Sequence, residues 1–226
     1  MIEFNYTGKD HLDALEYARQ YNLSILNWIK GGISTTEAVL DFGAGKGIFC
    51  NELSEYNVFA VEPDRSMHEH IKCPVVTSLD EYDRNFNVIY SINVLEHIKD
   101  HGGIIRKFRD ALYPGGKVKI FVPAFPLLYS SMDRLVGHYR RYSRGELTSL
   151  LINEGFDIVD IRYFDFAGFF VSLPYKLVNR SGAINPAQVR FYDRYLFPAS
   201  RFMDVITGGR LLGKNIMIEA RKSSGQ

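Results

Sequence analysis

The stretch of sequence that decides the fold is Val39-Leu40-Asp41-Phe42-Gly43-Ala44-Gly45-Lys46-Gly47. An apolar run leads into the glycines and residues 48–56 favour a helix, so the pattern indicates a strand, a tight loop and a helix. Gly43 and Gly45 carry no Cβ atom, and a ligand can therefore lie directly on the main chain. The loop is suited to binding a nucleoside.

An acid further along the chain strengthens this interpretation. Glu62 ends the next expected strand, where a carboxylate can accept hydrogen bonds from both hydroxyls of a ribose. The third glycine comes one position too early for the dinucleotide fingerprint, and Lys46-Gly47-Ile48 is not the Gly-Lys-Ser/Thr ending of a nucleotide triphosphatase. The sequence therefore disfavours both NAD-dependent oxidoreduction and ATP hydrolysis.

Strand-like and helix-like segments alternate on both sides of the loop. We expect strands at 38–40, 57–61, 74–76, 86–91 and 117–122, and helices at 65–71 and in the stretch that ends at 112. Five strands joined by crossovers imply a parallel α/β sheet whose ligands bind beyond the carboxyl ends of the strands. Further expected elements are helices at 145–153 and 186–207 and strands at 156–164 and 215–220.

Length and composition predict one domain. The 226 residues are 46% hydrophobic and 23% charged, close to globular averages. The domain is expected to span residues 1–226 and to contain a cap helix within 1–32, a cofactor-binding core over 38–123, and acceptor-side insertions with C-terminal elements over 124–212. The cap helix follows from apolar residues at three- and four-residue steps between Asp10 and Lys30.

Charge and cysteine content exclude several classes of partner. The net charge of +1 provides no global field toward nucleic acid, so a nucleic-acid partner is not expected, although Arg140 and Arg141 form a local basic patch. Cys50 and Cys73 lack the spacing of a disulfide framework or a zinc site. With no signal-peptide pattern at the start, we expect a cytoplasmic protein.

The strand, the glycine loop and the acid are followed by two further motifs, Phe86-Asn87-Val88-Ile89-Tyr90-Ser91-Ile92-Asn93-Val94-Leu95-Glu96-His97 and Leu112-Tyr113-Pro114-Gly115-Gly116. Together these motifs resemble the class I S-adenosylmethionine-dependent methyltransferases of the small-molecule type. These motifs cover roughly residues 38–123. The resemblance implies a Rossmann-like three-layer sandwich with a seven-stranded, mostly parallel sheet and an antiparallel last strand. It also implies S-adenosyl-L-methionine as cofactor and S-adenosyl-L-homocysteine as product.

The same resemblance assigns the cofactor contacts. It would place Asp41, Gly43 and Gly45 at the methionine part, Glu62 at the ribose, Leu79 and Asp80 at the adenine, and Ser91 and Asn93 on the sulfonium side, with Ala44 and Pro63 completing the set. Phe42 and Lys46 depart from the family's usual loop, but side chains at both positions can point away from the ligand.

Methyl transfer to a hydroxyl or an amine needs an aligned acceptor and a base. On a starting helix Asn93, Glu96 and His97 would share one face and converge on the pocket, which makes His97 a catalytic candidate. The structural alternative is that Glu96 caps the helix and His97 packs beside the cofactor. Some members of the superfamily bind a divalent metal through Glu-x-x-Glu-His, but Asn93 occupies the first position here, and no metal is expected.

A second group of candidates lies in the connection after the fifth strand. His138 has both aromatic and arginine neighbours, and its near-neutral titration suits proton removal, so it is the preferred general base. The candidates for acceptor binding are Tyr139, Arg140, Arg141 and Tyr142, of which the arginines would clamp an anion. The structural alternative is that the arginines pair with Asp133 or Glu146, the tyrosines fix the loop, and His138 is merely buried and hydrogen-bonded.

These features predict S-adenosylmethionine-dependent methyl transfer, chiefly to oxygen, on a small or lipid-linked acceptor that is sugar-like or anionic. The alternative is a non-catalytic sensor or scaffold that keeps the nucleoside site, because fold and ligand site do not prove chemistry. A nucleic-acid methyltransferase would carry Asn/Asp-Pro-Pro-Tyr/Phe where Asn93-Val94-Leu95-Glu96 stands.

The aromatic segment Phe164–Val178 adds expectations about partners. It would roof an apolar pocket, touch a membrane surface as a peripheral contact, or form the seam of a homodimer. We expect Pro174 to break its helix, and the segment is shorter than the roughly 20 residues that a membrane span requires.

Overall fold

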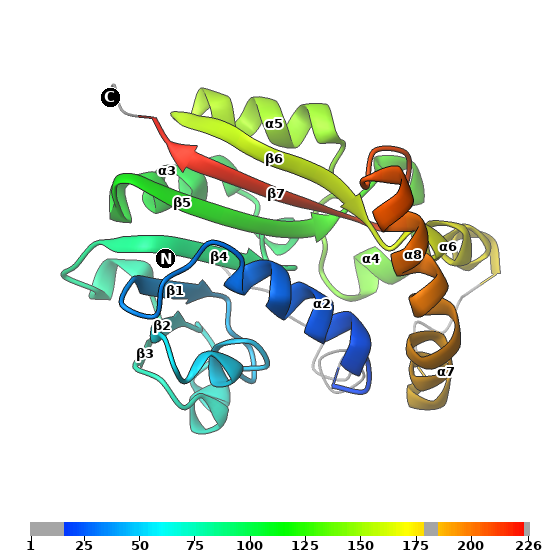
Figure 1. Cartoon of the computed structure of the whole chain (residues 1–226), viewed down its shortest axis with the longest axis horizontal. Coiled ribbons are helices and arrows are strands. Elements are labelled where there is room, and N and C mark those ends of the chain that lie inside the picture. The colour runs from blue at the N-terminus through cyan, green and yellow to red at the C-terminus, as the bar shows by residue number, and fades with distance from the viewer. Residues whose placement is uncertain (1–15, 179–184, 224–226) are drawn as a thin grey trace.

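The computed structural model describes residues 16–178 and 185–223 of the chain. Within them, seven strands form one sheet in the order β3-β2-β1-β4-β5-β7-β6 (Figure 1). The strands are β1 (Ala38–Phe42), β2 (Asn57–Val61), β3 (Val75–Val76), β4 (Phe86–Ile92), β5 (Leu112–Pro123), β6 (Phe156–Phe164) and β7 (Asn215–Lys222). β7 runs antiparallel to both β5 and β6, and the predicted fold class is confirmed.

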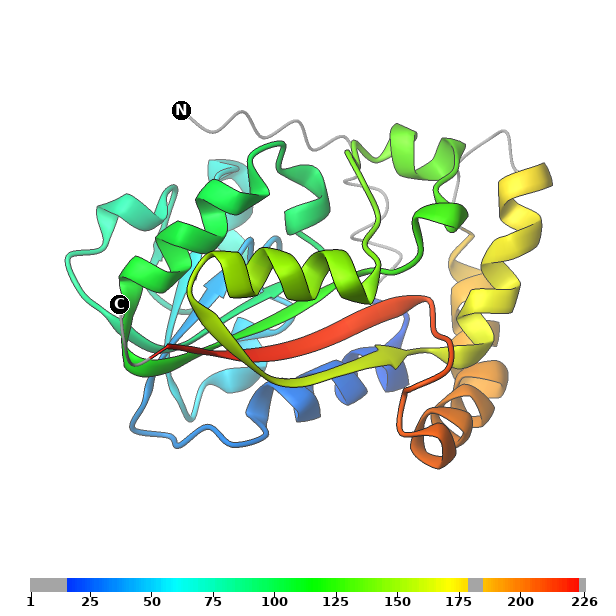
Figure 2. The ribbon, with the colours of Figure 1, turned by 90° about the horizontal axis from the view of Figure 1, so that it is seen from above.

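Helices cover both faces of the sheet and make three layers (Figure 2). The helices are α2 (Arg19–Lys30), α3 (His101–Ala111), α4 (Ser131–Leu135), α5 (Arg144–Asn153), α6 (Phe166–Val178), α7 (Pro186–Phe191) and α8 (Phe197–Thr207), with a π-helical segment, η6 (Tyr192–Leu196), between the last two. Apolar side chains of α3 and α5 share one core with the sheet, and those of α2 share a second core on the opposite face. The first part of the predicted cap helix, from Asp10 to Leu15, lies outside the described residues.

β1 is the centre of the fold. All five of its residues are buried, and it pairs with β2 on one side and with β4 on the other, both in parallel. The direction of winding therefore reverses between β1 and β4. In sheets of this type, ligands bind in the crevice outside the carboxyl ends of the strands at such a reversal, and the glycine loop begins there.

The crossovers around β2 differ from the sequence expectation. Short 3-10 helices, η1 (Cys50–Leu53) and η2 (Arg65–His70), stand where α-helices were predicted over 48–56 and 65–71. The Asn51 amide donates to His70 O at 2.8 Å and its Oδ1 accepts from Lys72 N at 2.8 Å. These side-chain bonds join the two crossovers and compete with a regular helix.

A buried lysine fastens α2 to the sheet. Lys119 of β5 is 1% exposed, and its Nζ donates to Trp28 O at 2.8 Å and to Gly31 O at 2.6 Å. These carbonyls end α2, where a cation is favourable. Glu219 of β7 lies 3.2 Å from the same ammonium group and balances its charge.

Pro174 lies inside α6, and the prediction that it breaks the helix is wrong. A proline within a helix frees the carbonyl four residues earlier, here that of Phe170. Phe170 is 48% exposed, so water can reach this part of the helix. At the other end, Asp165 Oδ1 accepts a hydrogen bond from Gly168 N at 3.1 Å and caps the first turn.

Candidate active site

Left-handed backbone residues gather where the central strands end. Gly43 follows β1 with φ +81°, Asn93 follows β4 with φ +54°, and Phe125 follows β5 with φ +58°. Non-glycine residues seldom adopt this conformation, and such strain concentrates at functional sites. The turn at Asn93 also means that the next helical residues are only Leu95–His97, so Asn93 does not share a helical face with Glu96 as predicted.

Gly43 leaves no room for a side chain. A Cβ atom added there would lie 2.4 Å from Val94 Cγ2. The amides of Gly43 and Ala44 both donate to Val61 O, at 2.8 and 3.1 Å, which fixes the loop against the end of β2. The loop surface is therefore bare backbone, as a cradle for a ligand requires.

Glu62 and the glycine loop hold each other in place. Glu62 Oε2 accepts a hydrogen bond from Gly45 N at 2.7 Å, and Oε1 accepts one from Asp64 N at 2.9 Å. Burial raises the pKa of this carboxyl, although the two amides oppose the rise. The two sequence signals, loop and acid, are thus in direct contact, with the half-buried Pro63 beside them.

Buried polar side chains lie on β1 and β4 next to the glycine loop. Asp41 of β1 and Tyr90 of β4 are paired in register, and Ser91 follows. Ser91 Oγ is buried without a hydrogen-bond partner among the described residues, and the buried Asp41 carboxylate has Tyr90 and Cys50 as its polar neighbours. Burial raises the pKa of Asp41 to about 7. Buried polar groups are nearly always satisfied, so the Ser91 hydroxyl fits a polar ligand such as the methionine part of S-adenosyl-L-methionine.

The two adenine candidates lie apart from these side chains. Leu79 is 6% exposed and belongs to the apolar core on the α3 side of the sheet. The Asp80 carboxylate is exposed and forms an ion pair with Lys107 of α3, whose hydrogen bond lowers the pKa of Asp80. Contact of either residue with the adenine stays a prediction.

The two separate groups of catalytic candidates meet in space. Glu96, His97 and His138 each offer a ligand-type atom, and the three atoms lie within 4.8 Å of one another. His138 Nε2 is 3.9 Å from Glu96 Oε1, and the two imidazole rings stand edge to face with centroids 4.6 Å apart. Glu96 is fully buried, and neither of its carboxylate oxygens has a hydrogen-bond partner among the described residues, so it caps no helix.

Asp133 orients His138. Its Oδ1 lies 2.8 Å from His138 Nδ1 and accepts a hydrogen bond from Arg141 Nε at 2.7 Å. Its Oδ2 accepts the Ser130 amide at 2.8 Å. Burial alone would raise the pKa of Asp133, but the bonds to His138 and Arg141 outweigh it and hold the pKa well below its usual range.

The titration of the cluster follows from burial. Desolvation raises the pKa of Glu96 to about 7, against the attraction of His138. Burial, and then the charge of His138, lower the pKa of His97 to about 3, so His97 is a neutral imidazole at physiological pH. Such a set can accept a proton at His138 or hold a divalent cation with two histidines and one carboxylate.

Some of the candidate residues for acceptor binding are already held by other side chains, and others are exposed or incompletely hydrogen-bonded. Tyr142 is buried with its hydroxyl 2.9 Å from His101 Nδ1, and Arg141 is held by Asp133, as the structural alternative expected. Tyr139 is 48% exposed. Arg140 donates from Nη2 to Lys99 O at 3.0 Å, while its buried Nη1 has no close hydrogen-bond acceptor among the described residues.

Two surface cavities are lined by other parts of the chain. One of about 480 Å³ is lined by β6 and α8 residues, including Arg144, Arg210, Val205 and Ile206. The other, of about 310 Å³, lies beside the start of β2. Neither is lined by the glycine loop or by residues 133–142, so the site is identified by its polar groups and backbone.

The buried Glu96 carboxyl predicts a pH-dependent stability. Its pKa is about 7 in the folded protein against an ordinary 4.5, so the folded state holds an extra proton between these values. The stability present below pH 4.5 is therefore lost as the pH rises toward 7, by about 3 kcal/mol. Glu96→Gln should abolish this component in denaturant titrations across that range.

The exposed Glu55 provides the matched control, since Glu55→Gln should keep the wild-type slope. If Glu96→Gln also keeps that slope, the carboxyl is not held in its neutral form by burial.

Comparisons with known proteins agree with this geometry. A family model described as a methyltransferase domain matches residues 15–161. No curated protein matched the chain.

Solved structures with the same fold include an S-adenosylmethionine-dependent methyltransferase from Mesorhizobium loti, with a TM-score of 0.60 and 16% identity over 89% of this chain and 98% of that chain. One from Archaeoglobus fulgidus has a TM-score of 0.59 and 18% identity over 96% of each chain. Haemonchus contortus phosphoethanolamine N-methyltransferase 2, bound to phosphomonomethylethanolamine and S-adenosylhomocysteine, has a TM-score of 0.59 and 18% identity, covering 95% of this chain and 58% of that chain. At these identities, the likenesses show the fold.

Proposed function

The chain belongs to the methyltransferase-domain family, and from that premise we propose that it methylates an oxygen of a small or lipid-linked, sugar-like or anionic acceptor, with His138 as the general base. The protein is an S-adenosylmethionine-dependent methyltransferase, so S-adenosyl-L-methionine is its cofactor. The identity of the acceptor and the roles of individual residues are the proposal.

The hydrogen bond between Asp133 and His138 carries the proposal. A carboxylate that accepts from Nδ1–H leaves the lone pair on Nε2, which is the tautomer that a base needs. Nε2 lies 3.9 Å from Glu96 Oε1, and the Glu96 carboxyl in its ionised form is close enough to stabilise the imidazolium that forms. His97, a neutral neighbour of the same ring, positions His138.

The proposed roles divide between the two halves of the site. Asp41, Gly43, Gly45 and Glu62 would hold the cofactor, which when bound supplies an electrophilic methyl group on its sulfonium. His138 Nε2 would take the proton of the acceptor hydroxyl, and the rest of the catalysis is alignment.

Arg140 supports an anionic acceptor. Its guanidinium lies beside the Tyr142 hydroxyl, but Nη1 is buried without a close hydrogen-bond acceptor among the described residues, and a carboxylate or phosphate would supply one. The Haemonchus contortus enzyme with the same fold is bound to phosphomonomethylethanolamine, an anionic acceptor, which supports this class of molecule.

The proposal is tested by a transfer screen with the full chain. Phenols, sugars, carboxylic acids and lipid-linked glycans are incubated with S-adenosyl-L-methionine labelled in its methyl group, and S-adenosylhomocysteine formation is measured. We expect turnover with an oxygen acceptor that bears a negative charge and an O-methyl product by NMR. A product methylated on nitrogen or sulfur would overturn the assignment to oxygen.

Metal removal distinguishes the two chemistries open to the histidine cluster. If His138 acts as a base, turnover should stay within about twofold after dialysis against EDTA. The measurement is the initial rate before and after dialysis, with Mg²⁺, Mn²⁺ or Zn²⁺ added back. Loss of turnover that one cation restores would place that metal on Glu96, His97 and His138 and overturn the base assignment.

A further inference from the structure

The helical stretch 186–207, which runs through α7, η6 and α8, exposes apolar side chains along one side. Phe191, Tyr195, Phe202, Val205 and Ile206 are between 58% and 70% exposed. Their spacing along the helical stretch places them in one stripe. In a helix that only covers a core, this stripe would face inward.

The opposite side of the same stretch is buried and acidic. Asp193 is 6% exposed, and its two oxygens accept the amides of Gln20 and Tyr21 at 3.0 and 2.9 Å. Asp204 is 5% exposed and accepts the amides of Asp165 and Phe166, both at 3.0 Å. These bonds tie the stretch to α2 and to the start of α6, so the exposure of the apolar stripe is fixed by a satisfied polar network.

The charges of the described helical stretch are unevenly placed. Between positions 186 and 214 its two acids, Asp193 and Asp204, are buried, and its five basic residues are Arg190, Arg194, Arg201, Arg210 and Lys214. Arg190, Arg194 and Arg201 each directly precede an exposed aromatic residue. Apolar side chains flanked by arginines are typical of helices that lie at a membrane interface.

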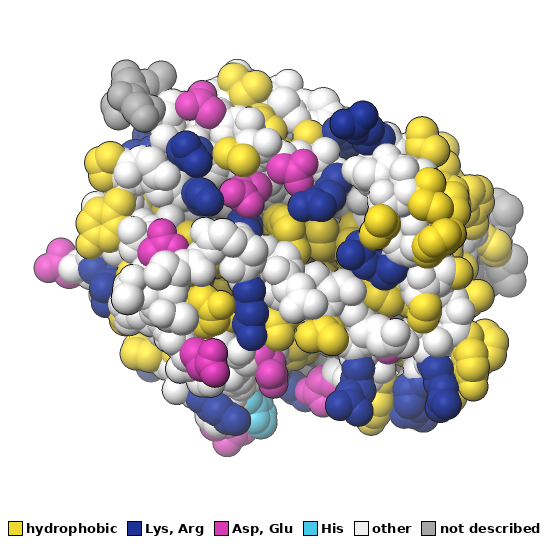
Figure 3. Space-filling model, in the orientation of Figure 1, with side chains coloured by type: hydrophobic (Ala, Val, Ile, Leu, Met, Phe, Trp, Pro, Cys, Tyr) yellow, Lys and Arg dark blue, Asp and Glu magenta, His cyan; other side chains and the backbone are white. Residues whose placement is uncertain are grey.

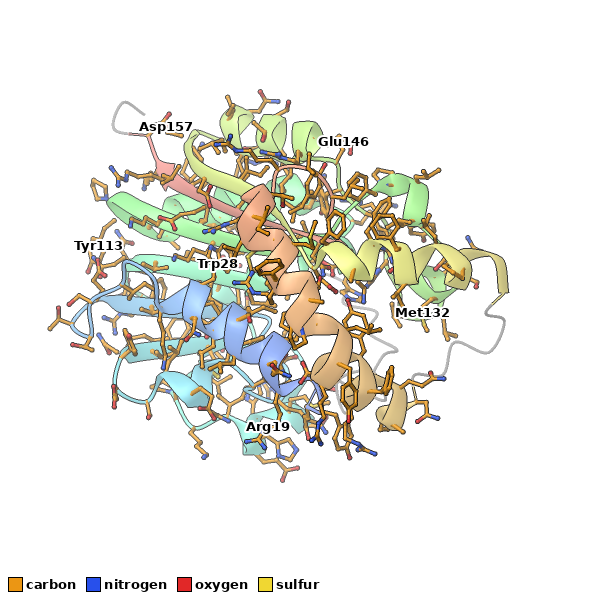
Figure 4. All side chains as sticks on the ribbon, turned by 45° about the vertical axis from the view of Figure 1, so that its right-hand side comes forward. Arg19, Trp28, Tyr113, Met132, Glu146 and Asp157 are labelled. Atoms are coloured by element: carbon orange, nitrogen blue, oxygen red, sulfur yellow. The ribbon has the colours of Figure 1, made fainter. Side chains whose placement is uncertain are left out.

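Neighbouring elements carry further exposed apolar side chains. We call these side chains and the stripe together the α6–α8 surface; its exposed apolar members are Phe170, Val171, Leu173, Phe191, Tyr195, Leu196, Phe202, Val205, Ile206 and Leu211. Figure 3 shows hydrophobic side chains gathered over α8 and α6 with basic side chains beside them, and in Figure 4 the side chains of these helices project outward. Exposed patches of this kind mark interaction sites.

The α6–α8 surface lies at the end of the sheet where β4 and β5 end (Figure 1). The ring of Phe169 in α6 is 5.0 Å from that of Phe125, which begins the connection leading to His138. The cavity of about 480 Å³ opens beside Val205 and Ile206, and Arg144 and Arg210 line it. Its acid, Asp160, is paired with Arg162 at 2.9 Å, and Arg144 donates from Nη2 to Ile161 O at 2.9 Å, which leaves Arg210 as the arginine of the cavity that could bind a phosphate.

We propose that the α6–α8 surface docks this protein onto an anionic phospholipid bilayer. The stripe would enter the interface between headgroups and acyl chains, and the arginines would contact the phosphates. No helix among the described residues is long and apolar enough to cross a membrane, which leaves an arrangement in the plane of the interface. A second copy of the chain is disfavoured as the occupant because its matching surface would bring arginines against arginines, while the acids of the helical stretch, Asp193 and Asp204, are buried.

The inference concerns binding and is independent of the methylated atom. Where it combines with the proposed function, it explains how a lipid-linked acceptor reaches the site, because the docked surface and the strand ends lie at the same end of the protein. Membrane binding is measured without turnover, so failure of one proposal leaves the other testable.

The test is flotation of the full chain with vesicles of phosphatidylcholine alone or mixed with phosphatidylglycerol. We expect flotation with the anionic vesicles, little with phosphatidylcholine alone, and a decrease as salt is raised. Phe202→Asp/Val205→Asp should reduce the bound fraction about tenfold or more. The control, Tyr113→Asp/Ile152→Asp, changes residues that are 42% and 55% exposed outside the patch and should float like the wild type.

Three outcomes would overturn the inference. They are absence of flotation with anionic vesicles, equal flotation of Phe202→Asp/Val205→Asp and wild type, and a dimer in light scattering that Phe202→Asp/Val205→Asp converts to monomer. Circular dichroism of each variant confirms that the substitution leaves the fold intact.

Discussion

A Gly43→Val protein is expected to bind S-adenosyl-L-methionine at least about a hundredfold more weakly than the wild type in titration calorimetry. The main chain at Gly43 has φ +81°, which costs a side-chain-bearing residue roughly 1–2 kcal/mol. The new Cβ would also lie 2.4 Å from Val94 Cγ2, so the loop or the turn that leads into Leu95–His97 must move. Either movement disturbs the amides of Gly43 and Ala44 that are fixed on Val61 O.

Two further variants separate the causes of this loss. Gly145→Ala places a methyl group on α5 with no atom within 4 Å and should leave both binding and melting temperature unchanged. Gly43→Ala/Val94→Ala removes the overlap but keeps the unfavourable φ, and it should recover thermal stability more than affinity. Wild-type affinity in Gly43→Val would show that the cofactor does not lie on this loop.

The glycine loop and its acid could be predicted because their signals are local and regular. Gly43 and Gly45 stand in one turn between a buried strand and a helical stretch, and Glu62 ends the next strand. Parallel pairing of β1 with β2 then brings the acid to the loop, and the bond between Gly45 N and Glu62 Oε2 follows from topology. The antiparallel β7 was predicted for a different reason, namely the resemblance to a known family.

The sequence predicted the histidines of the catalytic cluster, but not their contact or the role of Asp133. His138 and His97 were singled out by residue type, but their contact joins segments about forty residues apart and depends on how the connection after β5 folds back. Asp133 was taken as an ion-pair partner, whereas it also orients His138. Ser130 three positions earlier was a usable signal, because the pair forms a capping box at the start of α4.

The sequence pattern could not predict that the apolar stripe of α7 to α8 is exposed, and the reason is physical. Periodicity gives the position of each residue around a helix but not which side faces the core. Here Asp193 and Asp204 are buried by bonds to main-chain amides of distant segments, and Phe202 and Val205 are left outside. A pattern based on apolar residues alone assigns the reverse orientation.

His138→Gln is expected to lower kcat/KM about 10²- to 10⁴-fold while the affinity for S-adenosyl-L-methionine stays within about twofold. The His138 ring is bonded to Asp133 through Nδ1 and lies beside Glu96 with Nε2. Its removal therefore deletes a base and leaves the hydrogen bonds of the glycine loop intact. Glutamine keeps a hydrogen-bonding group near Asp133 but does not accept a proton at neutral pH. His70→Gln, on the exposed side of η2, is the matched control and should change neither quantity.

Acceptor acidity identifies the step that is lost. For a phenol that is neutral at the assay pH, His138→Gln should show the full defect, whereas a nitrophenol that is already ionised should be methylated at a rate within about tenfold of wild type, because no proton must be removed. Asp133→Asn should follow the same pattern with a smaller defect, since it acts through the orientation and tautomer of His138. Melting temperatures of both variants must accompany the rates, because Asp133 also holds Ser130 and Arg141. Equal defects on the two acceptors would assign His138 to structure, and the base would have to be sought elsewhere.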